Sequence, residues 1–367
     1  MNNTERDNLH VLVVDDSAVV REVMTAVLAQ EQDIVVATAS DPLIAMQKMR
    51  HQRPDVIILD LEMPRMDGLT FLRQIVRSDP IPVVVCSALT GAGTTLGLQA
   101  MEEGAVDVVT KPRLGVKEFL FESAVTLIDA VRAAHRSRRT LGRAGLRTPT
   151  PTPRRTADAA LPAKPTSRLS RPSNRVIAVG ASTGGTEALR VILEAMPPDV
   201  PGLLIVQHMP EGFTNAFAQR LNQTCRIEVK EAESGDRVVA GRALIAPGNR
   251  HALISAVAGE YIVDVVDGPL VSRHRPSVDV LFRSVAQSAG AKAIGVILTG
   301  MGSDGAEGLL KMKQSGAMTI AQDEASCVVF GMPKEAIERG AAGQIIGLGQ
   351  IADCILRGVN EANRAAS

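Results

Sequence analysis

The chain has 367 residues, enough for two separate hydrophobic cores and a connection between them. Its 40 Lys and Arg residues balance its 40 Asp and Glu residues, so overall charge gives no reason to expect a nucleic-acid or membrane-surface partner. No uncharged apolar run approaches the roughly 18 residues of a membrane span, and the first residues lack the pattern of a secretion signal. We therefore expect a multidomain cytoplasmic protein that neither inserts in a membrane nor binds nucleic acid.

The composition also predicts an aliphatic core, because the chain has no Trp, one Tyr and seven Phe. Buried strands of parallel α/β sheets are typically rich in Val, Ile and Leu, which suits this composition. The four cysteines contain no Cys-x-x-Cys pair, so we expect buried small hydrophobes rather than disulfides or zinc ligands. They are Cys86, Cys225, Cys327 and Cys354.

Five short apolar runs alternate with stretches of helical periodicity in the first part of the chain. Unbroken apolar runs of this length are typical of buried parallel strands. The runs lie at 9–14, 34–38, 56–59, 83–86 and 106–109. We predict a doubly wound, mostly parallel, flavodoxin-like sheet over residues 1–136, with its functional groups at the carboxyl ends of the strands.

Polar side chains follow several of these predicted strands. Asp15 and Asp16 come directly after the first run, and Asp60 after the third. Carboxylates that meet at one sheet edge repel one another unless a hard cation such as Mg²⁺ lies among them. Ser87 and Lys111 follow the fourth and fifth runs, where a hydroxyl and an ammonium can hold a phosphoryl group. The alternative is that the acids only cap helices or lie in solvated loops.

These residue types at these strand ends resemble the receiver domain of two-component response regulators. The resemblance implies that Asp60 accepts a phosphoryl group and that the two aspartates after the first strand bind Mg²⁺ together with Asp60 and the backbone carbonyl of Glu62. It also implies that Ser87 and Lys111 contact the phosphoryl oxygens and couple phosphorylation to the face of the fourth and fifth strands. One position departs from the family pattern, because Val108 stands where an aromatic switch residue is common.

Periodicity disappears between residues 137 and 173, where Arg, Pro, Thr and Ala dominate. The run Thr-Pro-Thr-Pro-Thr-Pro-Arg-Arg at 148–155 is typical of an extended linker. Its arginines offer an alternative role in contacting an anionic partner. We expect a solvated tether and assign no site to it.

A second alternating pattern occupies residues 174–367. Its strand-like runs lie at 176–179, 203–206, 243–245, 293–298 and 318–320. Between 226 and 267, short β-rich pieces separated by turn signals predict hairpins within or beside the sheet. We therefore predict a second doubly wound, Rossmann-like domain with a β-hairpin region.

A tight glycine-rich turn follows the first strand of this domain. Gly180, Ser182 and Gly184 satisfy the pattern G-x-S-x-G between a strand and a helix. Such a turn exposes a serine at a helix N-terminus, where backbone N–H groups favour developing negative charge. A phosphate-binding loop uses the same features, so the motif alone leaves both interpretations open.

A possible base and its orienting acid favour the nucleophile. His208 follows the second strand of this domain and Asp304 follows the strand-like run at 293–298, so both should reach the edge that holds Ser182. His251 begins an apolar run and His274 lies between two arginines, which makes them weaker candidates for the base. The pattern predicts a Ser-His-Asp arrangement whose chain order differs from that of ordinary α/β-hydrolases.

Six sequence blocks in this domain follow in order behind the receiver-like domain. They read Gly-Ala-Ser-Thr-Gly-Gly-Thr-Glu-Ala, Gln-His-Met-Pro, Ile-Ala-Pro-Gly, Arg-His-Arg-Pro-Ser-Val-Asp-Val-Leu-Phe, Leu-Thr-Gly-Met-Gly-Ser-Asp-Gly and Phe-Gly-Met-Pro. Together they resemble the chemotaxis methylesterase family, CheB, over residues 175–355. The resemblance implies hydrolysis of glutamate methyl esters, and deamidation of selected glutamines, on methyl-accepting chemoreceptors. It implies no cofactor for the hydrolysis and a chemotaxis histidine kinase as phosphodonor.

Within this interpretation, the remaining site residues have subsidiary roles. The Met301 backbone N–H, in a glycine-flanked turn, is expected to stabilise the oxyanion. Thr183 is a candidate neighbour of the nucleophile. Arg273, His274 and Arg275 are candidates for the substrate cleft, with a structural or solvated role as the alternative.

Two other functions fit parts of the sequence. A non-enzymatic, phospho-responsive binding module would hold a phosphorylated ligand at the Ser182 turn. A DNA-binding regulator would need a helix-turn-helix pattern or a basic recognition stripe, and we find neither in the sequence. We favour the hydrolase, with the unphosphorylated first domain covering the Ser182 cleft.

Overall fold

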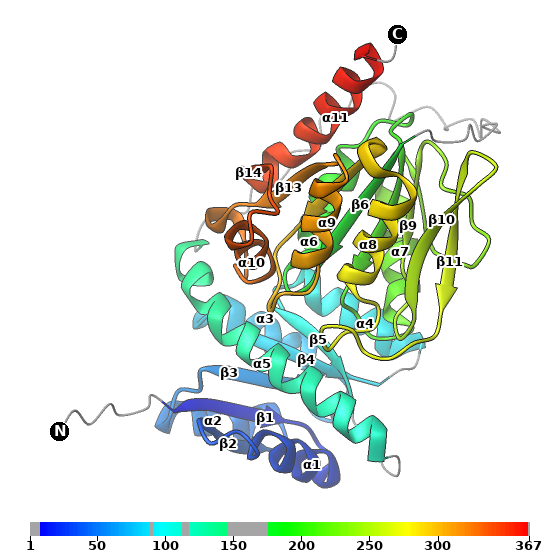
Figure 1. Ribbon diagram of the computed structural model, residues 1–367. Coiled ribbons are helices and arrows are strands. Elements are labelled where there is room, and N and C mark those ends of the chain that lie inside the picture. Colours follow the sequence, from blue (N-terminus) through cyan, green and yellow to red (C-terminus); the bar gives the residue numbers. More distant parts are fainter. Residues whose placement is uncertain (1–7, 89–90, 112–116, 145–174, 366–367) are drawn as a thin grey trace, which may run out of the picture.

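The computed structural model describes residues 8–88, 91–111, 117–144 and 175–365, which form two large sheets flanked by helices and one two-stranded sheet (Figure 1). Both large sheets are parallel throughout, so the predicted class of two mostly parallel α/β domains is confirmed. The predicted linker starts too early, because residues 137–144 continue helix α5 (Lys117–Ala144); the rest of the range 137–173 lies outside the described residues.

The first sheet has the strand order β2-β1-β3-β4-β5. Its strands are β1 (Leu9–Val14), β2 (Ile34–Ala39), β3 (Val56–Asp60), β4 (Val83–Ser87) and β5 (Asp107–Thr110). The helices are α1 (Ala18–Leu28), α2 (Pro42–His51), α3 (Gly68–Ser78), α4 (Gly91–Glu102) and α5 (Lys117–Ala144). Every residue of β3 and β4 is buried, as the unbroken apolar runs predict for strands covered on both faces.

Short polar side chains start the first three helices. Ser17, Asp41 and Asp67 each accept a hydrogen bond from a backbone N–H in the following turn. These caps satisfy donors that a helix start otherwise leaves free. Because each helix begins just after a strand, the caps fix the loops at the carboxyl edge of the sheet.

The second sheet has the order β14-β13-β12-β6-β7-β9-β8. Its strands are β6 (Val176–Ala181), β7 (Gly202–Gln207), β8 (Glu228–Glu231), β9 (Arg242–Ile245), β12 (Ala293–Ile297), β13 (Met318–Gln322) and β14 (Gln344–Ile346). The helices are α6 (Gly185–Glu194), α7 (Phe213–Thr224), α8 (Val278–Ser288), α9 (Ala306–Gln314), α10 (Met332–Glu338) and α11 (Leu348–Ala365). Central β6 lies between β12 and β7, which brings their three carboxyl ends together.

The region 226–267 contains one hairpin rather than several. β10 (His251–Val257) pairs antiparallel with β11 (Glu260–Val266), as the turn signals predict. β8 and β9, however, pair parallel and extend the main sheet, so the expectation of hairpins is wrong there. Strand direction depends on which neighbour a strand reaches, and turn residues do not specify that. β14 was not predicted, because a three-residue strand has too few positions to show a period.

Three of the four cysteines, Cys86, Cys327 and Cys354, are buried and free, as predicted. Cys225 is only half-buried, because it caps the end of α7 at the surface. In the part of the chain that the structure describes, no helix is long and apolar enough to cross a membrane.

Candidate active site

The three carboxylates at the edge of the first sheet converge as predicted. Asp15, Asp16 and Asp60 each offer an oxygen within 4.8 Å of the others. The Lys111 ammonium lies 2.7 Å from Asp60 Oδ2 and 3.3 Å from Asp15 Oδ2. One ammonium leaves two of three carboxylate charges unbalanced, so these oxygens suit a divalent cation such as Mg²⁺.

Burial raises the pKa of Asp60, and the hydrogen bond and charge of Lys111 offset this only in part. The pKa therefore lies above its ordinary value, with the neighbouring Asp15 charge adding to the rise. A cation at this cluster would stabilise the ionised carboxylate, which is the form that can attack a phosphoryl group.

The other predicted residues of this edge have defined contacts. Ser87 is buried, and its hydroxyl donates to the Gly93 carbonyl at 2.9 Å. The Glu62 N–H donates to Asp60 Oδ1 at 3.1 Å, which fixes the loop that carries the Glu62 carbonyl. The sequence did not single out Arg21, whose guanidinium donates to the Asp15 carbonyl at 2.7 Å and anchors the acidic loop.

The Ser182 turn joins β6 to α6. The Ser182 carbonyl accepts from the Gly185 N–H at 2.7 Å and from Gln207 Nε2 at 2.9 Å, and the Ser182 N–H donates to the Thr299 carbonyl at 3.0 Å. Gly184 has a left-handed φ of 78°, a conformation that costs glycine little and other residues more. The turn therefore holds a buried serine at the start of a helix.

His208 and Asp304 lie beside this turn. The backbone N–H of His208 donates to the carbonyl of Ala181, the residue before Ser182, at 3.0 Å. Its ring Nε2 lies 2.8 Å from Asp304 Oδ2. Its Nδ1 is buried and has no hydrogen-bond partner among the described residues. Asp304 therefore occupies one ring nitrogen and leaves the other as an available proton acceptor.

The first turn of α8 holds the Asp304 carboxylate. Asp304 Oδ2 accepts from the Val278 N–H at 2.7 Å, and Oδ1 accepts from the Ser277 hydroxyl at 2.8 Å and the Asp279 N–H at 3.0 Å. Burial alone would raise the pKa of Asp304, but the hydrogen bond and charge of His208, with a smaller effect of the Asp279 N–H, lower it below its ordinary value. Ser277 was not predicted as a site residue, although it precedes an apolar helical run as an N-cap serine does.

His274 stacks directly on His208. The ring centroids are 3.7 Å apart and the planes are inclined by 12°. Burial, followed by the charge of His208, lowers the pKa of His274 to about 3. His274 is therefore neutral at pH 7, and its flat ring restricts the motion of the His208 imidazole.

The His274 pKa predicts an acid-sensitive fold. Its ordinary pKa is 6.5, so below that pH the unfolded chain binds a proton that the folded chain does not accept until about pH 3. The folded state consequently loses stability as pH falls through this window, by up to roughly 1.4 kcal/mol per pH unit. We expect urea unfolding at several pH values to show a weaker pH dependence for His274→Phe than for the unsubstituted chain. The same pH dependence of the unfolding free energy in both proteins would contradict this prediction.

Met301 follows Gly300 in the turn after β12, and Gly300 packs against the predicted nucleophile, Ser182. A β-carbon placed on Gly300 would lie 2.6 Å from Ser182 Cβ, so the Gly300 backbone packs directly against the Ser182 side chain. Met301 is half-buried and follows directly. The structure thus brings the predicted nucleophile, base, acid and oxyanion donor to one sheet edge.

The remaining cleft candidates contact the first domain or their own loop. Thr183 Oγ1 donates to Asp107 of β5 at 2.7 Å, and Arg273 pairs with Asp129 of α5 at 3.3 Å. Arg275 instead donates to the Gly268 carbonyl and the Asn249 side chain, which holds the loop before α8.

More distant contacts join the two domains along α4 and α7. Glu102 of α4 pairs with Arg220 of α7. Phe213, fully buried at the start of α7, packs so closely on Gly97 that a β-carbon there would lie 2.6 Å from its ring. Val328 packs against the core of the first domain. The first domain therefore lies over the residues that surround Ser182.

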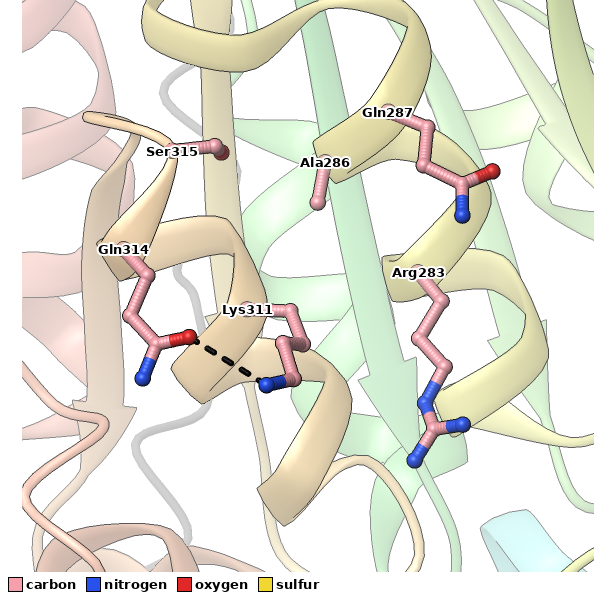
Figure 2. A pocket seen from close by; sticks show the side chains of 6 residues that line it. All are labelled: Arg283, Ala286, Gln287, Lys311, Gln314 and Ser315. Carbon is pink, nitrogen blue, oxygen red and sulfur yellow. Dashed lines mark hydrogen bonds between the residues drawn. The ribbon is translucent and has the colours of Figure 1, made fainter.

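A surface hollow of about 460 Å³ lies elsewhere, between α8 and α9 (Figure 2). Both helices begin beside Asp304, whereas the lining residues come from their later turns. They are Arg283, Ala286, Gln287, Lys311, Gln314 and Ser315. None is a predicted catalytic residue.

The second domain brings Ser182, His208 and Asp304 to one sheet edge, and the first domain carries an acidic edge of the receiver type. Residues 177–355 match the family model described as CheB methylesterase, and residues 11–118 match the response regulator receiver domain. The chain belongs to the CheB methylesterase family.

Curated relatives match along nearly the whole chain. A protein-glutamate methylesterase/protein-glutamine glutaminase of Geobacter metallireducens is 56% identical over 95% of this chain and 98% of the relative. One from Pseudomonas syringae pv. tomato is 55% identical over 95% of this chain and 98% of the relative. The crystal structure of the Thermotoga maritima CheB methylesterase catalytic domain is 39% identical, covering 50% of this chain and 97% of that one, with a TM-score of 0.49.

Proposed function

We propose that the second domain hydrolyses γ-methyl esters of glutamate side chains with Ser182, His208 and Asp304 as its catalytic triad. The observation that carries the proposal is the His208 ring, which bonds Asp304 through Nε2 and keeps a buried, unpartnered Nδ1 among the described residues. A histidine that only stabilised the core would have both nitrogens satisfied or one in solvent. Family membership supports the same activity.

Catalysis begins when Ser182 Oγ attacks the ester carbonyl and His208 Nδ1 takes its proton. Asp304 stabilises the imidazolium and fixes which nitrogen is free. The Met301 N–H binds the oxyanion, a type of contact worth roughly 3 kcal/mol in other serine hydrolases. His208 then gives the proton from Ser182 to the departing methoxide, which leaves as methanol. In the second half His208 takes a proton from the water that attacks the acyl-serine and returns it to Ser182 Oγ, which releases the glutamate carboxylate.

Glutamine deamidation uses the same acyl chemistry. The amide carbonyl passes through the same oxyanion, but the nitrogen leaving group depends more strongly on protonation by His208. We therefore expect deamidation to be slower than demethylation.

The substrate we propose is the methylated region of chemoreceptors, and the phosphodonor is a chemotaxis histidine kinase. Asp60 accepts the phosphoryl group, with Asp15, Asp16 and the Glu62 carbonyl as ligands of Mg²⁺. The cation would neutralise charge on the entering phosphoryl group. Lys111 and Ser87 then contact the phosphoryl oxygens, for which Ser87 must leave the Gly93 carbonyl.

We propose that the first domain inhibits the second by covering it. Asp107 accepts a hydrogen bond from Thr183, the residue after Ser182. Asp129 pairs with Arg273, the residue before His274. Phosphorylation at Asp60 would reshape the face that carries both aspartates, so that Thr183, Arg273 and His274 become available to a bulky substrate. Arg275 supports that loop.

The direct test incubates the full-length protein with membranes that contain methyl-labelled chemoreceptors. Released methanol reports ester hydrolysis, and mass spectrometry of receptor peptides reports conversion of glutamine to glutamate. Methanol release with added phosphodonor and Mg²⁺ supports the proposal. Tight binding of a phosphorylated ligand at the Ser182 turn without any hydrolysis would favour the binding module instead.

Loss of the phosphoacceptor should uncouple the two domains. In Asp60→Ala, a phosphodonor and Mg²⁺ should leave methanol release at the unphosphorylated rate, because no group remains to accept the phosphoryl group. Chelation of Mg²⁺ should likewise prevent activation of the unsubstituted protein. Activation of Asp60→Ala to the normal level would show that another group receives the signal.

A further inference from the structure

The orientation of one peptide group decides whether the proposed oxyanion donor can act. The Gly300 carbonyl accepts two backbone hydrogen bonds, from the Gly331 N–H at 3.0 Å and the Met332 N–H at 2.8 Å. A trans peptide is planar, so its C=O and N–H point in opposite directions. With the Gly300 carbonyl fixed toward Gly331 and Met332, the Met301 N–H is directed away from them.

The same segments tie this peptide to the nucleophile turn. Thr299 Oγ1 donates to the Thr183 carbonyl at 3.0 Å and accepts from the Val329 N–H at 3.0 Å. The Gly300 N–H donates to the Val329 carbonyl at 3.0 Å. The strand end at 299–300 is therefore bonded to the Ser182 turn on one side and to 329–332 on the other.

Packing leaves no space for another arrangement. A β-carbon on Gly331 would lie 2.6 Å from the Gly300 oxygen, 3.0 Å from the Gly302 nitrogen and 3.0 Å from Met301 Cα. A β-carbon on Gly300 would lie 2.5 Å from Met332 Sδ and 2.6 Å from Ser182 Cβ. Any side chain on Gly331 must therefore displace the turn that carries Met301.

We propose that the backbone N–H groups of Gly331 and Met332 are positioning groups for the oxyanion site. They hold the Gly300 carbonyl so that the Met301 N–H, and not that carbonyl, faces the developing oxyanion. The inference rests on the proposed function, because it needs a Ser182 oxyanion to stabilise. It gives the Phe-Gly-Met-Pro block, which contains no triad member, a role in the reaction.

Two variants of Met332 isolate one of the N–H groups. Met332→Ala and Met332→Pro both remove the thioether side chain, but only proline replaces the N–H, and its Cδ then points at the Gly300 oxygen that the N–H held at 2.8 Å. Proline therefore both removes the donor and displaces the carbonyl, at a helical position where its φ is allowed. Loss of one oxyanion donor costs about 10²- to 10³-fold in kcat, and a loosened donor should cost part of that. We expect Met332→Pro to have a kcat at least about tenfold below that of Met332→Ala, with the same KM for methylated receptor.

A second variant tests the steric argument. Gly331→Ala should lower kcat without raising KM, because its methyl group displaces the oxyanion turn. Gly349→Ala is the matched control, because no atom lies within 4 Å of a β-carbon there and its residue is exposed on α11. The pH profile of kcat/KM should keep its shape in Gly331→Ala, since His208 and Asp304 are untouched.

Binding of a boronic acid gives a readout besides turnover, because its adduct with a serine places an anionic oxygen in the oxyanion site. Boronate affinity should fall with kcat in Met332→Pro and Gly331→Ala. Equal kcat and equal boronate affinity in Met332→Pro and Met332→Ala, or a loss seen only in KM, would overturn the inference. Should the unsubstituted protein release no methanol, the proposed function itself would fail. If Met332→Pro does not fold, the comparison of kcat and boronate affinity between Gly331→Ala and Gly349→Ala tests the inference instead.

Discussion

Ser182→Ala is expected to abolish methanol release, with kcat reduced about 10⁶-fold as for nucleophile removal in other serine hydrolases. The substitution removes the attacking oxygen but leaves the turn intact, because Ser182 bonds its neighbours through backbone atoms. The fold and its unfolding midpoint should therefore hardly change. Initial rates of methanol release from labelled receptors, with phosphodonor present, measure the effect.

The matched control is Ser315→Ala, at the far end of α9, where the hydroxyl donates to the Met312 carbonyl and to no other group among the residues described. It should retain full activity. His208→Ala should approach the loss seen in Ser182→Ala, whereas Asp304→Asn disturbs orientation and can cost up to about 10⁴-fold. Full activity in a folded Ser182→Ala protein would end the triad mechanism.

Gly97→Ala is expected to activate the unphosphorylated enzyme. Its methyl group would lie 2.6 Å from Phe213 Cε1 and 3.3 Å from Val108 Cγ2, so the closed interface becomes overpacked. Overpacking typically costs about 1–3 kcal/mol. If that cost falls on the closed state alone, the open population rises by about 5- to 150-fold. Methanol release without phosphodonor should rise accordingly.

Gly91→Ala controls for helix propensity, because Gly91 also belongs to α4 and no atom lies within 4 Å of its β-carbon position. It should keep the basal rate of the unsubstituted protein. Adding Phe213→Leu to Gly97→Ala should lower the rate again if the contact is steric. An unchanged basal rate in Gly97→Ala would mean that this contact does not hold the domains together.

The sequence alone predicted the strands that carry the site. Runs such as 56–59 and 176–179 are apolar at every position, which only strands covered on both faces require. Polar residues directly after such runs lie at the carboxyl edge of a parallel sheet. Local pattern was therefore enough to place Asp60, Ser182 and His208 at the carboxyl edges of the two sheets.

Tertiary structure decided how these residues meet. β12 pairs with β6, more than a hundred positions earlier in the chain, and that pairing brings Asp304 to His208. It also decided that α8 holds the Asp304 carboxylate through Ser277 and that His274 stacks on the base. No local period encodes such contacts, because they depend on the strand order of the finished sheet.

The same reason explains the interface and the β8–β9 pairing. The sequence indicates two domains and a connection, but the contacts of Thr183 with Asp107 and of Phe213 with Gly97 join residues far apart in the chain. From the sequence, Gly97 only lowers the helix propensity of α4, and the structure shows that Phe213 packs where a side chain at this position would lie. Composition and periodicity therefore determined which elements form and which strand ends carry polar residues. Packing between distant segments determined which hydrogen-bond partner each candidate catalytic group has, because burial of one segment against another fixes distances that neither segment specifies alone.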